Sequence, residues 1–222
     1  MNLVLLGPPG SGKGTQAERI AEEFNLKVFS TGDILRQLAK EETPLGRKIK
    51  EILRRGELVP EEIMAEILAD FLSKVGREGI LFDGYPRNLE QAKILTSHLE
   101  KLGGVSLAIY LKVRPEVVVK RLGSRRICPN CGAVYNLETK PPKRENVCDS
   151  CGSRLVCRED EKPAAIRKRL AVFEAQTLPV LEFFKKEGNL VTIDGEASIE
   201  TVYQEIKEEI KKCASRDRNN TG

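Results

Sequence analysis

A glycine-rich segment near the start of the chain carries the clearest chemical signal. Residues 7–15 read Gly-Pro-Pro-Gly-Ser-Gly-Lys-Gly-Thr. Four glycines leave no side chains between the backbone and a ligand, so successive N–H groups can turn onto a phosphate. Lys13 supplies a full charge for the β- and γ-phosphates of a nucleotide, and Thr15 offers a hydroxyl near a metal ion or the α-phosphate. The segment therefore predicts a nucleotide phosphate site.

The spacing departs from the strict pattern G-x-x-x-x-G-K-[ST], because residue 14 is Gly and the hydroxyl follows at position 15. A plain Gly/Pro turn is the alternative interpretation. Such a turn needs one or two glycines, not four with a lysine. An apolar run precedes the segment and a helical pattern follows it, which is the context of a phosphate-binding loop. The start of that helix adds the positive end of its dipole.

Four of the six cysteines form a second pattern. Cys128-Pro-Asn-Cys131-Gly and Cys148-Asp-Ser-Cys151-Gly are separated by sixteen residues. Each pair can place two sulfurs on one ion, and two pairs close a tetrahedral four-thiolate site. We expect structural Zn²⁺ there, although cobalt or iron also suits four thiolates. Reduced or disulfide-paired motifs without metal are the alternative. Cys157 and Cys213 have no partner at a useful spacing and are predicted to be ordinary thiols, with Cys157 as a remote alternative ligand.

Arginines stand beside the predicted loops and at the borders of the cysteine segment. A planar guanidinium binds phosphate oxygens through paired donors, as phosphoryl transfer requires. One arginine alone usually means a solvated helix face, but the set favours a site for polyanions: Arg36, Arg87, Arg121, Arg125, Arg158, Arg167 and Arg169. Asp83 ends an apolar segment, where a carboxylate can orient magnesium; a turn or helix N-cap is the competing interpretation.

The elements that must position these residues alternate along the chain. Strand character is found at 3–6, 27–30, 79–83, 106–113 and 189–194. Helical patterns cover 13–24, 31–40, 45–55, 60–75, 88–102, 115–125, 163–187 and 197–212. Apolar strands alternating with helices predict an α/β fold with a parallel five-stranded sheet covered on both faces. Ligands then bind at the carboxyl ends of the strands, where the residues singled out above lie.

Length and composition set the remaining bounds. The chain has 222 residues, of which 32% are charged and 40% hydrophobic, as in a soluble globular protein. No apolar run is long enough to span a membrane, and no secretion-type leader is recognisable, so we expect a cytoplasmic protein. Residues 31–59 and 126–158 interrupt the alternation and are predicted insertions. The net charge of +4 and the absence of Trp argue against a nucleic-acid partner.

Together these segments closely resemble the adenylate kinase family, in the long-lid, zinc-containing form of many bacteria. The resemblance runs from residue 1 to about residue 214. Besides the glycine-rich loop, the motifs that carry it are Ser30-Thr-Gly-Asp-Ile-Leu-Arg36, Gly56-Glu-Leu-Val59, Phe82-Asp-Gly-Tyr-Pro-Arg87 with Gln91, Arg121-Leu-Gly-Ser-Arg125, and Arg158-Glu-Asp160 followed by Arg167-Lys-Arg169.

The resemblance implies a P-loop NTPase-type core with two insertions. The core would comprise 1–29, 60–125 and 159–222, the helical AMP-binding domain 30–59, and the zinc-knuckle lid 126–158. The implied reaction is reversible phosphoryl transfer from MgATP to AMP, giving two ADP. Mg²⁺ and structural Zn²⁺ are the implied cofactors. The implied molecule is a monomer without nucleic-acid or membrane partners.

The resemblance also implies the site residues. ATP would be bound by Gly10, Ser11, Gly12, Lys13, Gly14, Thr15, Arg121, Val134, Tyr135 and Ala197. AMP would be bound by Thr31, Arg36, Glu57, Leu58, Val59, Gly84, Tyr85, Pro86, Arg87, Gln91, Arg158 and Arg169. The transferring phosphoryl group would be surrounded by Lys13, Arg87, Arg125, Arg158 and Arg169, and Asp83 would hold the water shell of magnesium.

Three alternatives remain at this level. A sister kinase could act on UMP or CMP, although such relatives tend to carry Ala where this chain has Thr31. A zinc-ribbon nucleic-acid binder could use ATP as a switch, and a purely structural metal protein is a third interpretation. Two segments depart from the family pattern: Glu159-Asp160-Glu161 replaces a pair of aspartates after Arg158, and the inner lid at 135–142 is unusually polar.

Overall fold

Five parallel strands form the central sheet of the computed structural model, which describes residues 1–76 and 78–219. The strand order is β2-β3-β1-β4-β7. Their bounds are Asn2–Leu6 (β1), Leu26–Ser30 (β2), Gly79–Asp83 (β3), Leu107–Lys112 (β4) and Leu190–Asp194 (β7). All five residues of β1 are buried, as expected for the middle of a sheet covered on both faces. The predicted α/β fold and all five predicted strands are confirmed.

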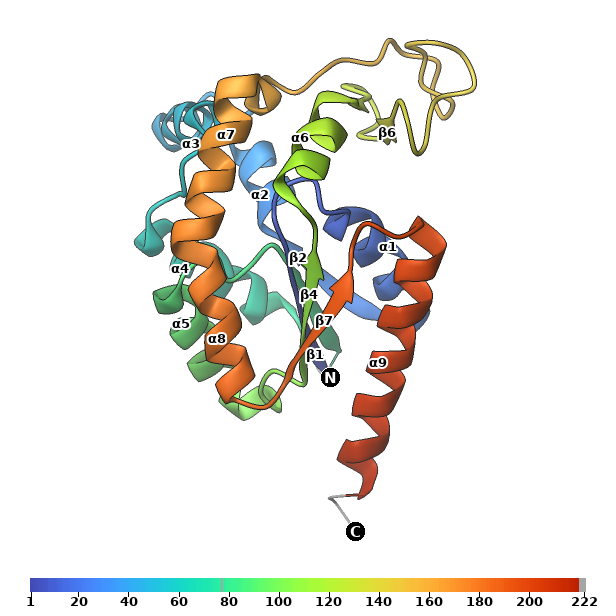
Figure 1. The fold of residues 1–222 in the computed structure, drawn as a ribbon. Coiled ribbons are helices and arrows are strands. Elements are labelled where there is room, and N and C mark those ends of the chain that lie inside the picture. The colour runs from blue at the N-terminus through green and yellow to red at the C-terminus, as the bar shows by residue number, and fades with distance from the viewer. Residues whose placement is uncertain (77, 220–222) are drawn as a thin grey trace.

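Two hydrophobic clusters lie on opposite faces of this sheet, because side chains alternate along a strand. Val4 and Leu6 belong to the cluster under one layer of helices, and Leu3 and Leu5 to the cluster under the other. The first layer contains α4 (Glu61–Lys74), α5 (Leu89–Leu99) and α8 (Leu178–Lys186). The second contains α1 (Lys13–Phe24) and α9 (Ile199–Asn219). Figure 1 shows these layers on either side of the strands.

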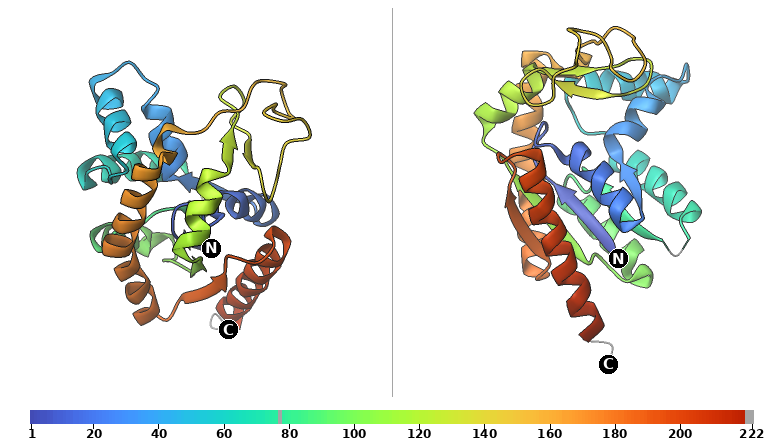
Figure 2. Two further views of the ribbon diagram at one scale, coloured as in Figure 1. Left: turned by 45° about the horizontal axis from the view of Figure 1, so that its top comes forward. Right: turned by 90° about the vertical axis from the view of Figure 1, so that its right-hand side faces the viewer.

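Two further groups of elements lie beyond the carboxyl end of the sheet (Figure 1). One consists of α2 (Thr31–Leu38) and α3 (Pro44–Arg55), which follow β2. The other follows α6 (Pro115–Gly123) and contains an antiparallel hairpin of β5 (Arg125–Ile127) and β6 (Val134–Asn136). Figure 2 (left) shows the two groups on opposite sides of α7 (Pro163–Val172). α2 and α3 lie within the segment 31–59, and the hairpin lies at the start of the segment 126–158. The bounds of the two expected insertions stay a prediction.

Local sequence explains where several helices begin. The Ser30 hydroxyl accepts the Asp33 N–H at the start of α2, and Thr43 accepts the Gly46 N–H at the start of α3. Asn88 caps α5 in the same way by accepting the Gln91 N–H. Such caps satisfy N–H groups that have no partner inside the helix. As a result, α2 begins directly after β2, and α5 begins directly after the loop that follows β3. Both helices therefore start at the edge of the sheet where ligands bind in folds of this kind.

The helix expected at 163–187 is interrupted. α7 ends at Val172, a π-helical turn covers Phe173–Thr177, and α8 begins at Leu178. Pro179 lacks an N–H and its ring would crowd the preceding turn of an α-helix, so a wider turn accommodates it. Tertiary contacts favour the same geometry, since the Thr177 hydroxyl donates to the Arg87 carbonyl at 2.8 Å and the Phe173 ring stacks on Tyr110.

None of the helices in the described part of the chain combines the length and apolar character that a membrane span requires. The remaining short elements are 3₁₀ turns at Glu100–Leu102 and Glu159–Glu161. The second of these turns directly precedes α7, and its Asp160 lines the cavity described next.

Candidate active site

A cavity of about 1260 Å³ opens at the carboxyl end of the sheet. It brings together most of the predicted site residues, from segments far apart in sequence. Its lining includes Gly10, Ser11, Gly12, Lys13, Gly14, Thr15, Arg36, Glu57, Leu58, Asp83, Gly84, Pro86, Arg87, Arg121, Arg125, Val134, Tyr135, Arg158, Arg169 and Ala197. A space of this size exceeds the usual range for a site of one small ligand.

Four predicted residues line an adjoining cavity of about 10 Å³ instead: Thr31, Val59, Tyr85 and Gln91. The Thr31 hydroxyl donates to the Gly84 carbonyl at 2.9 Å and accepts from Arg87 at 3.0 Å. The Gln91 carbonyl oxygen accepts the Arg87 N–H at 2.8 Å. In this structure Thr31 and Gln91 therefore hold Arg87 in place. Leu35 and Met64 line the same space and were not predicted.

The glycine-rich loop makes its turn with two glycines in the left-handed region. Gly10 and Gly12 adopt left-handed φ angles of 77° and 96°, which glycine tolerates best. A Cβ on Gly10 would also lie 2.8 Å from the Leu122 side chain. Lys13 begins α1 and donates from Nζ to the carbonyls of Gly7 and Pro8 at 2.8 and 2.9 Å. Burial lowers the pKa of Lys13 to about 8, against the opposing charge of Asp83.

Guanidinium groups from five separate segments face the same space. Arg36 comes from α2, Arg87 from the loop after β3, Arg125 from β5, Arg158 from the segment before α7, and Arg169 from α7. Burial lowers the pKa of Arg87 and of Arg158 to about 10, and neighbouring arginines act in the same direction. Burial likewise lowers the pKa of Arg125. Guanidinium groups are cations at neutral pH, so the cluster favours a highly charged anion.

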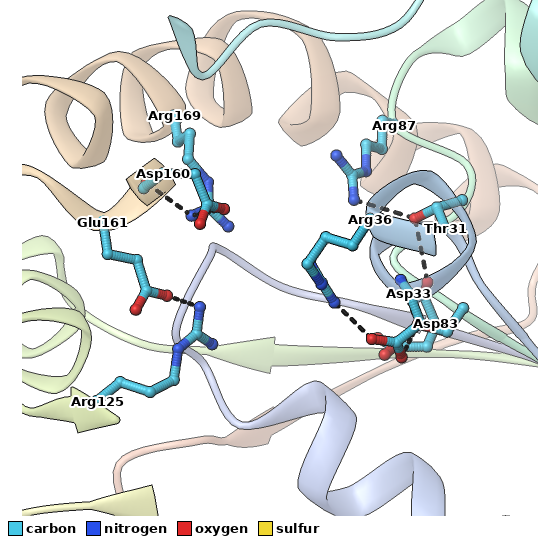
Figure 3. Close-up of polar contacts among 10 residues, drawn as sticks. Thr31, Asp33, Arg36, Asp83, Arg87, Arg125, Asp160, Glu161 and Arg169 are labelled. Carbon is cyan, nitrogen blue, oxygen red and sulfur yellow. Dashed lines mark hydrogen bonds and ion pairs between the residues drawn. The ribbon is translucent and has the colours of Figure 1, made fainter. Parts of the chain in front are cut away.

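Carboxylates hold three of these arginines, as Figure 3 shows. Arg36 contacts Asp33 at 2.6 Å, Arg169 contacts Asp160 at 3.1 Å, and Arg125 pairs with Glu161. These carboxylates were not predicted as site residues, although the acidic run after Arg158 was visible in the sequence. Within the described residues, the buried Nε atoms of Arg125 and Arg158 still have no hydrogen-bond partner. Unpaired buried donors of this kind are suited to an added phosphate.

Asp83 lies at the end of β3 beside the glycine-rich loop. Its carboxylate would be 3.7 Å from a Cβ placed on Gly14. Burial raises the pKa of Asp83, while the charges of Lys13 and Arg87 oppose that shift. A carboxylate between the lysine and the phosphate-binding backbone is suitably placed to accept hydrogen bonds from magnesium-bound water.

The opposite end of the cavity contains Arg121 and the loop around Ala197. Arg121 donates to the Gly195 carbonyl at 2.7 Å. Glu196 accepts from the Arg114 side chain at 2.6 Å, and hydrogen bonds from Arg114 lower the pKa of Glu196 to about 2. Gln16 donates to the Ile199 carbonyl at 3.0 Å. These contacts order the backbone of the loop. The positioning residues Gln16, Arg114 and Glu196 were not predicted.

The four cysteines of the two knuckles converge, and their sulfurs all lie within 4.8 Å of one another. Cys128 and Cys148 are buried, whereas Cys131 and Cys151 are exposed. The Cys131 N–H donates to the Cys128 sulfur at 3.5 Å, a contact that stabilises a thiolate. An all-sulfur set in one small cluster fits a tetrahedral Zn²⁺ ion. Cys157 lies outside the cluster and is exposed, and Cys213 contacts the Ser106 carbonyl.

Comparisons with known proteins agree with this geometry. A sequence profile described as "Adenylate kinase" matches residues 5–189. The chain is 47% identical to an adenylate kinase of Caldanaerobacter subterraneus over 209 residues, which cover 93% of this chain and 95% of the relative. It is 47% identical to that of Kosmotoga olearia over 93% of this chain and 97% of the relative. It is 48% identical to that of Bacillus licheniformis over 94% and 97%. This chain therefore belongs to the adenylate kinase family.

Proposed function

We propose that this protein catalyses reversible transfer of the γ-phosphoryl group of MgATP to AMP, giving two molecules of ADP. The main support for this proposal is that one cavity is lined both by the glycine-rich loop and by arginines from five segments. The loop suits the phosphates of a donor nucleotide, and the arginines suit the charge that spreads over a phosphoryl group in flight. The volume of about 1260 Å³ accommodates two nucleotides placed end to end.

On the donor side, the backbone of residues 10–15 and the Lys13 ammonium would bind the ATP phosphates. Lys13 would exchange the Gly7 and Pro8 carbonyls, which it contacts now, for phosphate oxygens. The planar guanidinium of Arg121 would stack on the adenine, whose amino group would be read by the Ala197 backbone. Val134 and Tyr135 would border the nucleotide from the cysteine segment. Magnesium, when bound, neutralises phosphate charge, and Asp83 would orient its water ligands.

On the acceptor side, Thr31, Gln91 and the segment 57–59 lie on the α2–α3 side of the cavity. The AMP base would enlarge the small space that Thr31, Val59, Tyr85 and Gln91 line. The Gln91 carbonyl oxygen has two lone pairs, and one of them accepts the Arg87 N–H. The other lone pair and the amide NH₂ group can still present an acceptor and a donor to one edge of adenine. Gly84 and Pro86 shape the loop that carries Arg87. Arg36, Arg87, Arg158 and Arg169 would bind the AMP phosphate.

The transfer itself needs positioning and charge more than proton chemistry. The attacking oxygen of AMP is already anionic at neutral pH, so no general base is required. Lys13, Arg87, Arg125, Arg158 and Arg169 would hold the phosphates in line and stabilise the transferring group. Closing of the cysteine-containing segment would exclude water that could otherwise hydrolyse ATP.

This function suggests a division of the chain into parts. The core would be 1–29, 60–125 and 159–222, the AMP-binding domain 30–59, and the lid 126–158. Structural Zn²⁺ bound by Cys128, Cys131, Cys148 and Cys151 would hold the lid together, and Mg²⁺ would accompany ATP. We further propose that the protein acts as a cytoplasmic monomer, since no step of the reaction requires a second copy.

A coupled assay with ATP and each nucleoside monophosphate in turn tests the proposal. AMP should be the best acceptor by kcat/KM, with UMP and CMP far poorer. If transfer to UMP or CMP were faster, that nucleotide would be the acceptor in place of AMP, and the reaction would still be phosphoryl transfer to a nucleoside monophosphate. No transfer to any monophosphate would overturn the function. Two adenosines joined by five phosphates should bind tightly with one molecule per chain, because that compound spans both nucleotide sites.

The proposed zinc is tested with Cys148→Ser, with Cys157→Ser as the matched control outside the cluster. Loss of one thiolate should remove about 2 kcal/mol or more, which lowers the melting temperature by roughly 4–8 °C in a chain of this size. Turnover at moderate temperature should fall much less. Loss of activity from a lid that remains folded would contradict a structural role, and so would equal melting temperatures in the two variants.

A further inference from the structure

Tyr135 lies between the cysteine cluster and the nucleotide cavity. Its side chain is 5% exposed and packs with Cys128, Cys148 and Leu155 in a small core of the lid segment. The Tyr135 hydroxyl accepts the Asp149 N–H at 2.8 Å and lies 3.5 Å from the Cys148 sulfur. A buried hydroxyl therefore contacts both the sulfur and the backbone of the second knuckle, although Tyr135 belongs to the first hairpin.

The direction of the second hydrogen bond follows from the first. A phenol has one proton and can also accept. Because its oxygen already accepts the Asp149 N–H, its proton is free for the sulfur. A thiolate that binds a metal ion carries no proton, so it can only accept. The Tyr135 O–H must then donate to Cys148, and such outer contacts hold metal-binding side chains in their geometry.

Tyr135 is also close to the proposed active site. With Val134 and Asn136, it lines the nucleotide cavity. In the β5–β6 hairpin, Tyr135 pairs with Arg126 and Asn136 pairs with Arg125. Asn136 also donates to the Arg121 carbonyl at 2.9 Å. One short strand thus joins the sulfur cluster to Arg125 in β5 and to Arg121 in α6.

We propose that Tyr135 is a positioning residue for the metal centre: its hydroxyl donates to the Cys148 thiolate and fastens the second knuckle to the hairpin that carries Arg125. The inference rests on the proposed zinc site. It assigns the Tyr135 hydroxyl to the cysteine cluster. Removal of the hydroxyl should weaken metal binding. It should not create a cavity in the core of the lid, because the aromatic ring remains.

Zinc release tests this with Tyr135→Phe, which keeps the ring and removes one oxygen. The matched control is Tyr110→Phe in β4, where the ring stacks on Phe173 in the core. A zinc-sensitive dye in excess should withdraw metal from the whole purified protein about tenfold faster in Tyr135→Phe than in the wild type, as is usual when an outer contact of a metal ligand is lost. Tyr110→Phe should release it at the wild-type rate.

A cobalt-substituted protein gives a readout that a general loss of packing would not produce. A hydrogen bond stabilises sulfur lone pairs, so its loss should move the sulfur-to-cobalt charge-transfer band to longer wavelength. The d–d bands of a tetrahedral four-sulfur site should persist. An unchanged charge-transfer band with an unchanged release rate would overturn the inference. A wild-type protein that binds neither zinc nor tetrahedral cobalt would overturn the proposed metal site instead.

Discussion

The two parts of the cavity that are proposed to bind phosphates are built in different ways. The glycine-rich loop is one continuous segment, residues 7–15, which offers main-chain N–H groups and one lysine. The arginine cluster contains side chains from five segments, spaced from Arg36 to Arg169 along the chain. The loop satisfies its lysine internally, through the Gly7 and Pro8 carbonyls. The arginines rely on carboxylates that the fold places beside them: Asp33, Asp160 and Glu161.

The loop and the arginine cluster should therefore respond differently to mutation. The loop is preorganised by local backbone geometry, so its function depends on small residues at fixed positions. The arginine cluster is preorganised by electrostatic balance among distant elements. Buried cations without partners are costly, and acidic side chains supply partners until phosphates arrive. Damage to the loop should therefore affect ATP selectively, whereas damage to the cluster should affect the transfer step or the stability of the free enzyme.

The largest effect is expected for Arg87→Ala. Arg87 is held by Thr31 and by the carbonyl of Gly84, in a direction that faces the proposed transferring group. Turnover should fall by roughly 10³-fold, the scale of losing a charged donor to a phosphoryl group in flight. Steady-state kinetics would measure the loss of turnover, and circular dichroism would check that the fold is intact. Arg167 was grouped with the site arginines from its sequence position, but it is exposed and is not among the residues that line the cavity. Arg167→Ala is therefore the control and should retain nearly full turnover. Unchanged turnover in Arg87→Ala would contradict its assigned role.

A substitution in the glycine-rich loop should raise KM for ATP without raising KM for AMP. Gly10→Ala introduces a Cβ at φ 77° and 2.8 Å from Leu122, which forces the loop to move. Strain on the order of 1–3 kcal/mol corresponds to a rise of roughly 5- to 150-fold in KM for ATP, with KM for AMP nearly unchanged. Gly188→Ala is the matched control, because its φ is 74° and nothing lies within 4 Å of the added Cβ. Equal rises for ATP and AMP would break the distinction between the two parts.

Glu161→Gln probes the balance of charge in the cluster. The Glu161 side chain is 2% exposed and pairs with Arg125, so its neutral form leaves a buried cation unbalanced. The free enzyme should lose about 2–4 kcal/mol of stability. A dinucleoside pentaphosphate should restore most of the loss, because phosphates give Arg125 new partners. Thermal unfolding with and without that ligand measures both quantities.

The control for this comparison is Glu138→Gln. Glu138 pairs with Lys120 at 3.0 Å, but both side chains are largely exposed. Exposed pairs contribute about 0–1 kcal/mol, so this variant should melt close to the wild type with and without ligand. A loss in Glu161→Gln that the ligand fails to restore would mean that Glu161 stabilises the fold for a reason unrelated to the phosphates.

The smallest effect concerns a proton. Burial lowers the pKa of Lys13 to about 8 in the free enzyme, whereas phosphate would favour the charged amine and raise that pKa on binding. Binding of ATP should therefore take up roughly half a proton at pH 8 and almost none at pH 6.5. Calorimetry in buffers of different ionisation enthalpy measures the uptake. Lys13→Met should abolish it, and equal uptake in the variant would assign the proton to another group.

Much of the fold was predictable because it rests on local patterns. The five strands are apolar runs and were predicted within two residues at each end. The helix at 163–187 was predicted as continuous, since Ala, Leu and Lys favour helix throughout, yet a π-helical turn interrupts it. Pro179 was the local signal for a break. The contacts of Thr177 with Arg87 and of Phe173 with Tyr110, which decide its position, join residues far apart in sequence.

The candidate site divides in the same way. The cysteine spacing predicted a cluster, and the four sulfurs do converge within 4.8 Å. By contrast, nothing in the sequence indicated that the Tyr135 hydroxyl contacts Cys148 or that Gln16 donates to Ile199. Gln91 was assigned to an adenine edge, and its assignment stays a prediction, whereas the structure has it accepting the Arg87 N–H. Such contacts depend on packing between elements, which residue spacing does not encode.

Residue type and short spacing were enough to locate the glycine-rich loop, the cysteine knuckles and the arginines. Which charges balance one another depends on how the whole chain packs. Arg125 and Glu161 are 36 positions apart, and β5 and the turn before α7 must fold before they meet. The strength of an ion pair depends on distance and burial, and both quantities are set by the packing of the whole chain.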